Sequence, residues 1–263
     1  MAISGKVGNV YSSALLLEDC EDVWTAGSAA SVISVVTGKV GTYCVRDTTT
    51  ALGAITLMMY EDITSTNLTA YDGIYCWLRS SVTTAAGNLQ VIIDETAACA
   101  VRLESLNVPI LTAATWKQFF GRLSDPSILN AVVSVGLYQV TDLADGTFDV
   151  DDVQALKEID GIKSWTLDYA SDTLEATDFD DAGIKSYIIG GSSWSGSFEG
   201  YKDTTPLGIG SEVYLVLGES TTAYQNWIGK VIITACHPST SHDGIVTYSY
   251  DFQGTGALET PSA

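Results

Sequence analysis

Apolar and polar residues alternate with a period of two along most of the chain. The clearest stretches lie at 73–79, 89–94, 213–217, 230–236 and 245–252. They are rich in β-branched and aromatic residues and are bounded by Gly, Ser, Asn or Asp, which is typical of β-strands. No long stretch keeps apolar residues at the i, i+3, i+4 spacing of a helix, so we expect one or two short helices at most. The pattern predicts an all-β protein.

The middle of the chain has the features of a self-contained unit. LLLEDCEDVW opens it, a run of strands follows, and FDVDDVQAL (148–156) closes it. Loops at the ends of sheets tolerate inserted domains when the two ends of the guest lie close together. A length of 263 residues also suits two domains. We therefore expect one domain made of residues 1–16 and 157–263, interrupted by an inserted domain at 17–156.

A short glycine motif recurs along the chain, as GKVG at 5–8 and 38–41 and as GKV at 229–231. A phosphate-binding loop needs four residues between its first glycine and a Gly-Lys-Ser/Thr ending, which none of the three has. We interpret each one as a turn that leads into a strand, where glycine supplies a permissive backbone.

The chain is strongly acidic, with 12 Lys and Arg against 32 Asp and Glu and a net charge of −20. Residues 17–157 carry 7 basic and 17 acidic residues and the remainder 5 and 15, so each part has a net charge of −10. Such a surface repels phosphate, which argues against sequence-specific DNA binding. An acidic balance can equally serve solubility alone. The start, MAISGKVGNVY, lacks an apolar stretch behind basic residues, so we expect no signal peptide and a cytoplasm-like site of synthesis.

The residues that most often carry chemistry are sparse. The five cysteines, Cys20, Cys44, Cys76, Cys99 and Cys236, form no CxxC pair and have no histidine at ligand spacing. We expect buried free thiols, with a disulfide only in an oxidising compartment. The two histidines, His237 and His242, share the turn CHPSTSHDG with Asp243 but with no further partner. Neither a nucleophile beside a base nor a convincing carboxylate pair is visible, so we expect a protein that is not an enzyme.

Six segments at the two ends of the chain occur in a characteristic order. They are GKVGNVY (5–11), IKSWTLDYASDTLEATDF (162–179), WSGSFEG (194–200), LGIGSEVYLVL (207–217), YQNWIGKVIIT (224–234) and YSYDFQGTGAL (248–258). Together they resemble the tail tube proteins, or major tail proteins, of long-tailed bacteriophages. The resemblance implies a β-sandwich or barrel subunit that forms hexameric rings, which stack into a channel for DNA. Residues 171–190 would then form the long hairpin loop that reaches the next ring, whereas the alternative is an ordinary surface loop.

One segment departs from that family. KDTTPLGIG (202–210) is short and contains Gly and Pro where relatives often carry a helix. The length of a flanking helix is therefore an open point of the resemblance.

The middle unit resembles a different group, the jelly-roll sandwiches of carbohydrate-binding modules. The resemblance rests on Leu17-Glu18 followed by Trp24, then GKVGTYCVRD (38–47), YDGIYCWLRSS (71–81), TWKQF (115–119) and VDDV (150–153). It implies a structural calcium ion held by the carboxylates of Glu18 and Asp151 and the carbonyl of Lys39, since Ca²⁺ prefers oxygen ligands. Alternatively these three are surface or turn residues.

The same resemblance implies that exposed rings stack on sugars, with Trp77, Trp116 and Tyr138 as the candidates. Core packing is the alternative for each of the three rings.

Taken together, the sequence favours a phage tail tube subunit with a jelly-roll that faces outward and binds cell-surface glycans weakly. Its partners would be further copies of itself, the tape measure and tail terminator proteins, and DNA that passes without sequence-specific contacts. It would be made in the bacterial cytoplasm and reside in the virion tail, with no membrane contact. A carbohydrate-binding module or adhesin with an accessory sandwich is the second hypothesis, and a capsid decoration protein is the third.

Overall fold

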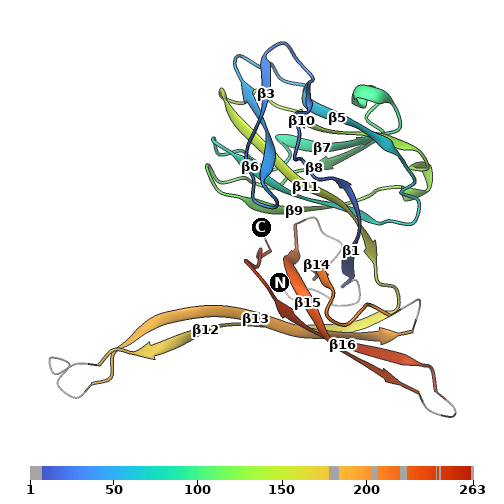
Figure 1. Cartoon of the computed structure of the whole chain (residues 1–263), viewed down its shortest axis with the longest axis vertical. Helices are drawn as coiled ribbons and strands as arrows, with labels where there is room; N and C mark the ends of the chain where they lie inside the picture. The colour runs from blue at the N-terminus through green and yellow to red at the C-terminus, as the bar shows by residue number, and fades with distance from the viewer. Residues whose placement is uncertain are drawn as a thin grey trace.

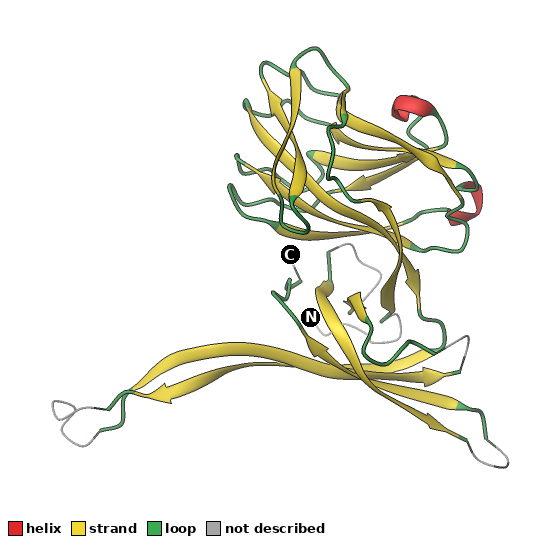
Figure 2. Cartoon of the chain, in the orientation of Figure 1, coloured by secondary structure: helices red, strands yellow, loops and turns green. Residues whose placement is uncertain are grey.

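The fold is almost entirely β-structure, as the computed structural model shows for residues 8–177, 184–202, 206–219, 224–240, 242 and 244–261 (Figure 2). The all-β prediction is confirmed. Within these residues the helical segments are two short 3₁₀ turns, Ala97–Cys99 (η2) and Pro126–Ile128 (η3). None of the helices in this part of the chain is long and apolar enough to cross a membrane.

The strands form one sheet of eleven and one of five. The larger sheet has the order β12-β13-β16-β15-β14-β1-β11-β4-β3, with β6 paired to β11 and β9 paired to β6. Its strands are β1 (Val10–Glu18), β3 (Ser31–Thr37), β4 (Tyr43–Thr49), β6 (Gly73–Ser80), β9 (Lys117–Arg122), β11 (Gly146–Glu158), β12 (Ile162–Glu175), β13 (Tyr187–Tyr201), β14 (Glu212–Gly218), β15 (Asn226–Ser239) and β16 (Thr247–Gly254). The smaller sheet consists of β2 (Thr25–Ala26), β5 (Thr56–Thr66), β10 (Val132–Gln139), β7 (Leu89–Asp94) and β8 (Glu104–Asn107).

Two bodies are visible in Figure 1, each built around its own apolar core. The core of the first, here called the middle body, draws its buried residues from between Cys20 and Ala155. The core of the second, the terminal body, uses Val10 together with residues from Trp194 to Phe252. Each body thus buries the apolar face of its own strands.

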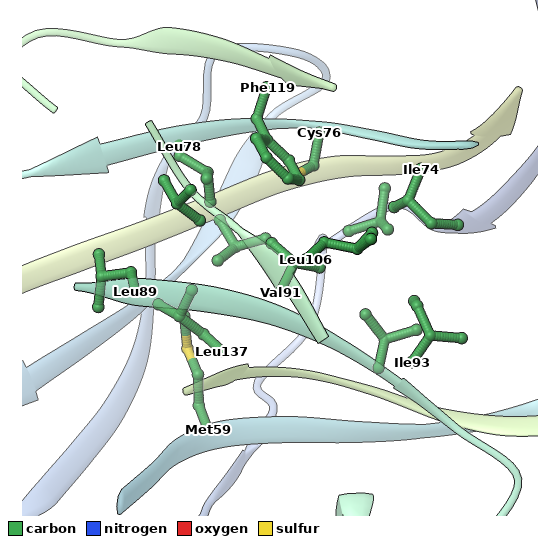
Figure 3. Close-up of a cluster of buried hydrophobic side chains, with 14 of the residues drawn as sticks. Met59, Ile74, Cys76, Leu78, Leu89, Val91, Ile93, Leu106, Phe119 and Leu137 are labelled. Carbon is green, nitrogen blue, oxygen red and sulfur yellow. The ribbon is translucent and has the colours of Figure 1, made fainter. Parts of the chain in front are cut away.

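The middle body is a sandwich whose two sheets face each other across its core. Ile74, Cys76 and Leu78 project from β6 toward the smaller sheet, and Val91 and Ile93 project back from β7 (Figure 3). All five side chains are at most 2% exposed. The alternation along each strand therefore places one face in the core, as the period-two pattern requires.

The terminal body packs around Trp194, which is 4% exposed and donates from its indole Nε1 to the carbonyl of Gly256 at 2.8 Å. Its ring lies against Gly229 and Gly254, where a Cβ atom would collide with it. This corrects one prediction, because the GKV motif at 229–231 lies inside β15 and not in a turn. Glycine is needed there for the close approach of the ring.

The motif at 38–41 behaves as predicted and forms the turn between β3 and β4. The amide of Gly38 donates to the carbonyl of Thr42 at 3.1 Å, and Gly41 has φ +64°. A positive φ favours glycine at this position. The first motif, at 5–8, lies almost wholly outside the described residues.

The first strand belongs to both bodies. Val10 to Ser12 pair with Leu215 to Leu217 of β14, while Tyr11 to Glu18 pair with β11. Trp165 of β12 also donates to the carbonyl of Gly218 at 3.3 Å, next to this strand. The amino-terminal strand thus shares a sheet with the carboxy-terminal third, as expected. The boundaries 1–16, 17–156 and 157–263 stay a prediction, because β1 and β11 run through both bodies.

The packing of Trp194 gives a direct test. We expect Gly254→Ala to lower the free energy of unfolding by about 1–3 kcal/mol, because the new methyl group overpacks against the ring. Gly256→Ala is the matched control, since no atom lies within 4 Å of its Cβ position. Chemical denaturation followed by tryptophan fluorescence measures both, and equal stability of the two variants would contradict this packing.

Candidate functional site

A polar surface covers the side of the terminal body that faces away from its core. We call it the polar sheet face and define it by alternate residues of β12, β13, β15 and β16. Its members are Thr166, Asp168, Ser195, Ser197, Thr234, Asp251 and Gln253. They alternate with core residues such as Trp194, Phe198 and Phe252, so the same strands have one apolar and one polar side.

The polar sheet face is lined by hydroxyls, amides and carboxylates that bond to one another. The hydroxyls of Thr166 and Ser197 lie 3.0 Å apart, and His237 Nε2 lies 3.1 Å from Asp251 Oδ2. These residues border a shallow hollow of about 370 Å³. Among the described residues that line the hollow there is no lysine or arginine. The surface therefore offers hydrogen-bonding groups and negative charge, without a cation.

This face points away from the middle body. On β14, Val213, Leu215 and Leu217 enter the core of the terminal body, while Tyr214 and Val216 pack toward the middle body. Since β13 and β16 close the other side of that core, their outer surface lies opposite the middle body. The polar sheet face and the middle body thus lie on opposite sides of the core of the terminal body.

β12 and β13 extend beyond the rest of the molecule as a two-stranded ribbon (Figure 1). We call residues 169–177 and 184–193 the hairpin arm. β13 pairs with β16 only from Ser195 to Tyr201, so in the described chain the arm strands pair only with each other. Much of the predicted loop at 171–190 is therefore strand, up to Glu175 and from Tyr187. Residues 178–183 of that loop lie outside the described residues.

β12 is also the edge of the larger sheet. In the described part of the chain its only partner is β13, so the backbone groups along its other side have no strand to pair with. β12 is fourteen residues long and contains no proline. A long unprotected edge of this kind is a template for pairing with another chain.

A third cluster of buried side chains joins the two bodies. We call it the inter-body cluster, and it consists of Tyr11, Tyr75, Trp77, Phe120, Leu156, Tyr214, Val216 and Ile228. The rings of Tyr75 and Tyr214 stack with centroids 4.2 Å apart, and those of Tyr11 and Phe120 lie 4.7 Å apart. Aromatic pairs at these distances add to the stabilisation that burial provides.

Polar contacts fix the position of the inter-body cluster. Gln118, which is 2% exposed, donates to the carbonyls of Ile228 and Ala257 at 3.2 and 3.1 Å. Lys117 Nζ forms an ion pair with Glu259 at 2.7 Å. Buried carbonyls that lose their donor are costly, so these bonds hold the bodies in one orientation.

The predicted sugar-stacking residues do not form one site. Trp77 and Tyr138 are 8% and 6% exposed, so the expectation that these two rings are open is wrong. Trp77 is buried in the inter-body cluster with Lys39 over its ring, and Arg102 covers Tyr138 at 4.3 Å. Trp116 is half-buried, with the guanidinium of Arg79 over its ring at 4.5 Å. Neither resemblance in the sequence indicated that the terminal body would cover the side of β6 that carries Trp77.

The predicted calcium ligands lie near one another but do not fit a ready-made site. Lys39 presents its amide, not its carbonyl, and donates to Asp151 Oδ2 at 2.7 Å, while Glu18 accepts from the amide of Cys20 at 3.1 Å. Amide hydrogens aimed at a carboxylate take the place that a cation would need. Among the described residues no three His, Cys, Asp or Glu side chains are grouped closely enough to hold a metal ion.

One oxygen of that group nevertheless has no hydrogen-bond partner, namely Oδ1 of the fully buried Asp151. Calcium at Glu18, Lys39 and Asp151 therefore stays a prediction. A melting temperature that rises when Ca²⁺ is added to EDTA-treated protein would support it, and an unchanged one would reject it.

The remaining residues with chemical potential are not brought together. All five cysteines are unpaired, and Cys20, Cys44, Cys76 and Cys99 are buried, as predicted. His237 lies on the outer side of β15 beside Asp251, and Asp243 lies outside the described residues. One signal for the polar sheet face is present in the sequence. In GGSSWSGSFEG, serines alternate with Trp194 and Phe198, which marks a strand with one hydroxyl side.

Comparison with known proteins gives distant likenesses only. No protein-family model matches the chain, and no characterised protein matches its sequence. One similar structure is a chain from the tail of an empty gene transfer agent particle, refined with C6 symmetry, at 17% identity and a TM-score of 0.35. The match covers 41% of this chain and 87% of that chain.

A second group of similar structures consists of CBM22 domains from Paenibacillus barcinonensis. The CBM22-1 xylan-binding domain of Xyn10C is 16% identical, with a TM-score of 0.37, over 59% of this chain and 98% of that chain. The N-terminal CBM22-1–CBM22-2 tandem of the same protein is 12% identical, with a TM-score of 0.35, over 97% of this chain and 100% of that chain. Likenesses this distant assign neither a fold nor a function to the chain.

Removing Gln118 tests the inter-body contact. We expect Gln118→Ala to lower the free energy of unfolding by about 1–3 kcal/mol, because the buried hydroxyl of Tyr75 loses its acceptor and the carbonyls of Ile228 and Ala257 lose the Gln118 donor. Gln90→Ala is the matched control, since Gln90 bonds only to Asn107 at the surface, and it should cost less than about 0.5 kcal/mol. Urea denaturation measures both, and an unchanged Gln118→Ala would show that the bodies are not held there.

Buried carboxylates predict an unusual pH dependence. Burial raises the pKa of both Asp47 and Asp151 to about 6, above that of the unfolded chain. The folded state therefore binds more protons between about pH 4 and 6, so the free energy of unfolding should rise as pH falls from 7 toward 5. Asp151→Asn should flatten this slope, whereas Asp142→Asn removes an exposed charge and should not. Urea midpoints across this range provide the measurement, and equal slopes would contradict it.

Proposed function

We propose that the chain is a structural subunit of a phage-type tail tube, in which copies join into hexameric rings that stack around a channel for DNA. The observation that carries this proposal is the polar sheet face. Asp168 and Asp251 place negative charge on it, and its hollow is lined without lysine or arginine. DNA carries one phosphate charge per ~1.7 Å of its axis, so a wall of this kind repels the polymer and keeps it from adhering.

The strands beside this face supply the means of assembly. β12 offers an unpaired edge to a neighbouring copy, and the hairpin arm projects beyond the body. Joining such edges continues a sheet from one copy to the next, which turns the polar sheet face into the inner wall of a closed barrel. The tape measure and tail terminator proteins would contact the ends of the tube, and the assembled protein would reside in the virion tail.

The middle body would decorate the outside of the tube, because it lies opposite the polar sheet face. Its binding of cell-surface glycans stays a prediction that now depends on Trp116, since Trp77 and Tyr138 are buried. The proposal assigns the chain a structural role and no catalytic one.

Electron microscopy tests assembly directly. Purified protein should form rings or tubes with external knobs, and monodisperse monomers at every concentration would contradict the proposal.

Charge reversal tests which surface faces the channel. The double variant Thr166→Lys and Asp168→Lys adds two lysines to the polar sheet face. Tubes assembled from it in the presence of short duplex DNA should retain that DNA at low salt in a form protected from nuclease, because phosphate now meets cations inside the wall. The matched control, Thr141→Lys with Asp142→Lys, makes the same changes on the exposed surface of the middle body and should protect no DNA.

Protection by the control and not by the first variant would place the channel elsewhere. Equal nuclease sensitivity of the DNA with both variants would also contradict the assignment of the wall.

A further inference from the structure

One edge of the larger sheet lies in the middle body and is formed by β3. In the described part of the chain, β4 is the only strand that pairs with it. The other strands that end a sheet in this body are short or covered, since β2 and β8 have two and four residues and β9 meets the terminal body through Gln118. β3 has seven residues, no proline and no bulge in its pairing. It therefore lacks the features that usually keep a sheet edge from pairing with another chain.

The sequence around β3 also carries no charge. Residues 23–38 contain no Asp, Glu, Lys or Arg, and only 126–141 form an equally long stretch of this kind. The second stretch includes β10, which lies between β5 and β7 and needs no protection. The first includes an edge strand, on which Val32 is 66% exposed. Because copies of a chain with a net charge of −20 repel one another, an uncharged edge is a place where two copies can approach closely.

The backbone of β3 presents hydrogen-bonding groups to its open side. The amide of Gly38 donates to the carbonyl of Thr42 at 3.1 Å, and the register between β3 and β4 runs back from there without a shift. Hydrogen-bonded and non-hydrogen-bonded pairs alternate along antiparallel strands, so the even-numbered residues of β3 bond to β4. The amides and carbonyls of Ile33 and Val35 therefore point away from β4. No described strand lies on that side to bond them.

The side chains of β3 are arranged symmetrically about the middle of the strand. In SVISVVT, positions at equal distance from the centre, Ser34, carry the same class of side chain: Ser31 with Thr37, Val32 with Val36, and Ile33 with Val35. Ile33 packs against the core, so Val32, Ser34 and Val36 lie on the outer face. An antiparallel second copy of β3 would place valine opposite valine on this face and serine opposite serine at its centre. Such cross-strand pairs stabilise a sheet.

We propose that β3 pairs antiparallel with β3 of a second copy of this chain, in the register that places Ser34 opposite its own counterpart. Ile33 of each copy then exchanges backbone hydrogen bonds with Val35 of the other, and one sheet runs through two middle bodies. Because both copies use the same surface, the contact has two-fold symmetry and ends at two copies. It is therefore separate from the head-to-tail contacts of a ring, and it does not rest on the proposed tube.

Cysteine cross-linking of the full chain tests the register. The central pair is not hydrogen-bonded, so its Cα atoms should lie about 4.5 Å apart, a distance that a disulfide spans. Under mild oxidation Ser34→Cys should give at least about tenfold more linked dimer than Val32→Cys. Val32 is the more exposed of the two, but its counterpart is offset by four residues, roughly 13 Å. Val32→Cys mixed with Val36→Cys should link, because these positions face each other.

A charge at the centre of the strand tests the pairing in a second way. Ser34→Lys brings two like charges face to face, so adding it to both the Val32→Cys and the Val36→Cys copies should lower the yield of their mixed dimer at least about tenfold. Ser105→Lys makes the same change at an exposed position of β8 and should leave the yield unchanged. Equal melting temperatures of the two lysine variants show that both fold.

The outcomes also separate this inference from the tube proposal. Ser34→Cys that links no better than Val32→Cys, or that links to a native cysteine by peptide mapping, would overturn the pairing and leave the edge open to a strand of another protein. Equal effects of Ser34→Lys and Ser105→Lys would overturn it too. Ser34→Lys should still form rings or tubes in electron microscopy, because β3 belongs to the middle body. Cross-linked pairs that never form rings or tubes would support the pairing and overturn the tube.

Discussion

The arrangement of the whole molecule depends on the backbone hydrogen bonds of β1. Val10 to Ser12 pair with β14 and Tyr11 to Glu18 pair with β11, so one strand is built into two cores. Backbone donors and acceptors that are buried must be paired, which ties the start of the chain to both bodies at once. The register Tyr11 to Glu158 also brings the strand that enters the middle body beside the strand that leaves it. Adjacent ends are the geometric condition for inserting one body into another.

The inter-body cluster then removes the freedom that such a connection would otherwise leave. Tyr75 stacks on Tyr214, and Gln118 bridges to two carbonyls of the terminal body. The face of the middle body that carries Trp77 is consequently covered by the terminal body of the same chain. This face could have bound a ligand, but it forms a fixed contact between the two bodies instead.

The sequence predicted the features that depend on a single strand. It did not predict those that depend on contacts between distant parts of the chain. Alternation located β6, β7 and β14 to β16, because each strand has one face in a core. The same alternation shows that Trp77 lies on the other side of β6 from Cys76, but it does not show what covers that side. The GKV motif at 229–231 was misread for a related reason, since the ring that requires Gly229 belongs to a residue 35 positions earlier, Trp194. The hydroxyl side of β13 was readable from its serines, whereas the inter-body cluster was not, because segments far apart in the sequence form it.

The polar sheet face and the middle body lie on opposite sides of the terminal body. Different parts of the chain therefore set the inner and the outer diameter of any cylinder that it builds. The bore is set by the β12, β13, β15 and β16 strands, whose lengths and tilt fix how many copies close the wall. The outer diameter is set by the middle body, which contacts the wall only on its outer side. Evolution can therefore thicken, trim or exchange the outer mass of such a cylinder while the diameter of its lumen stays the same.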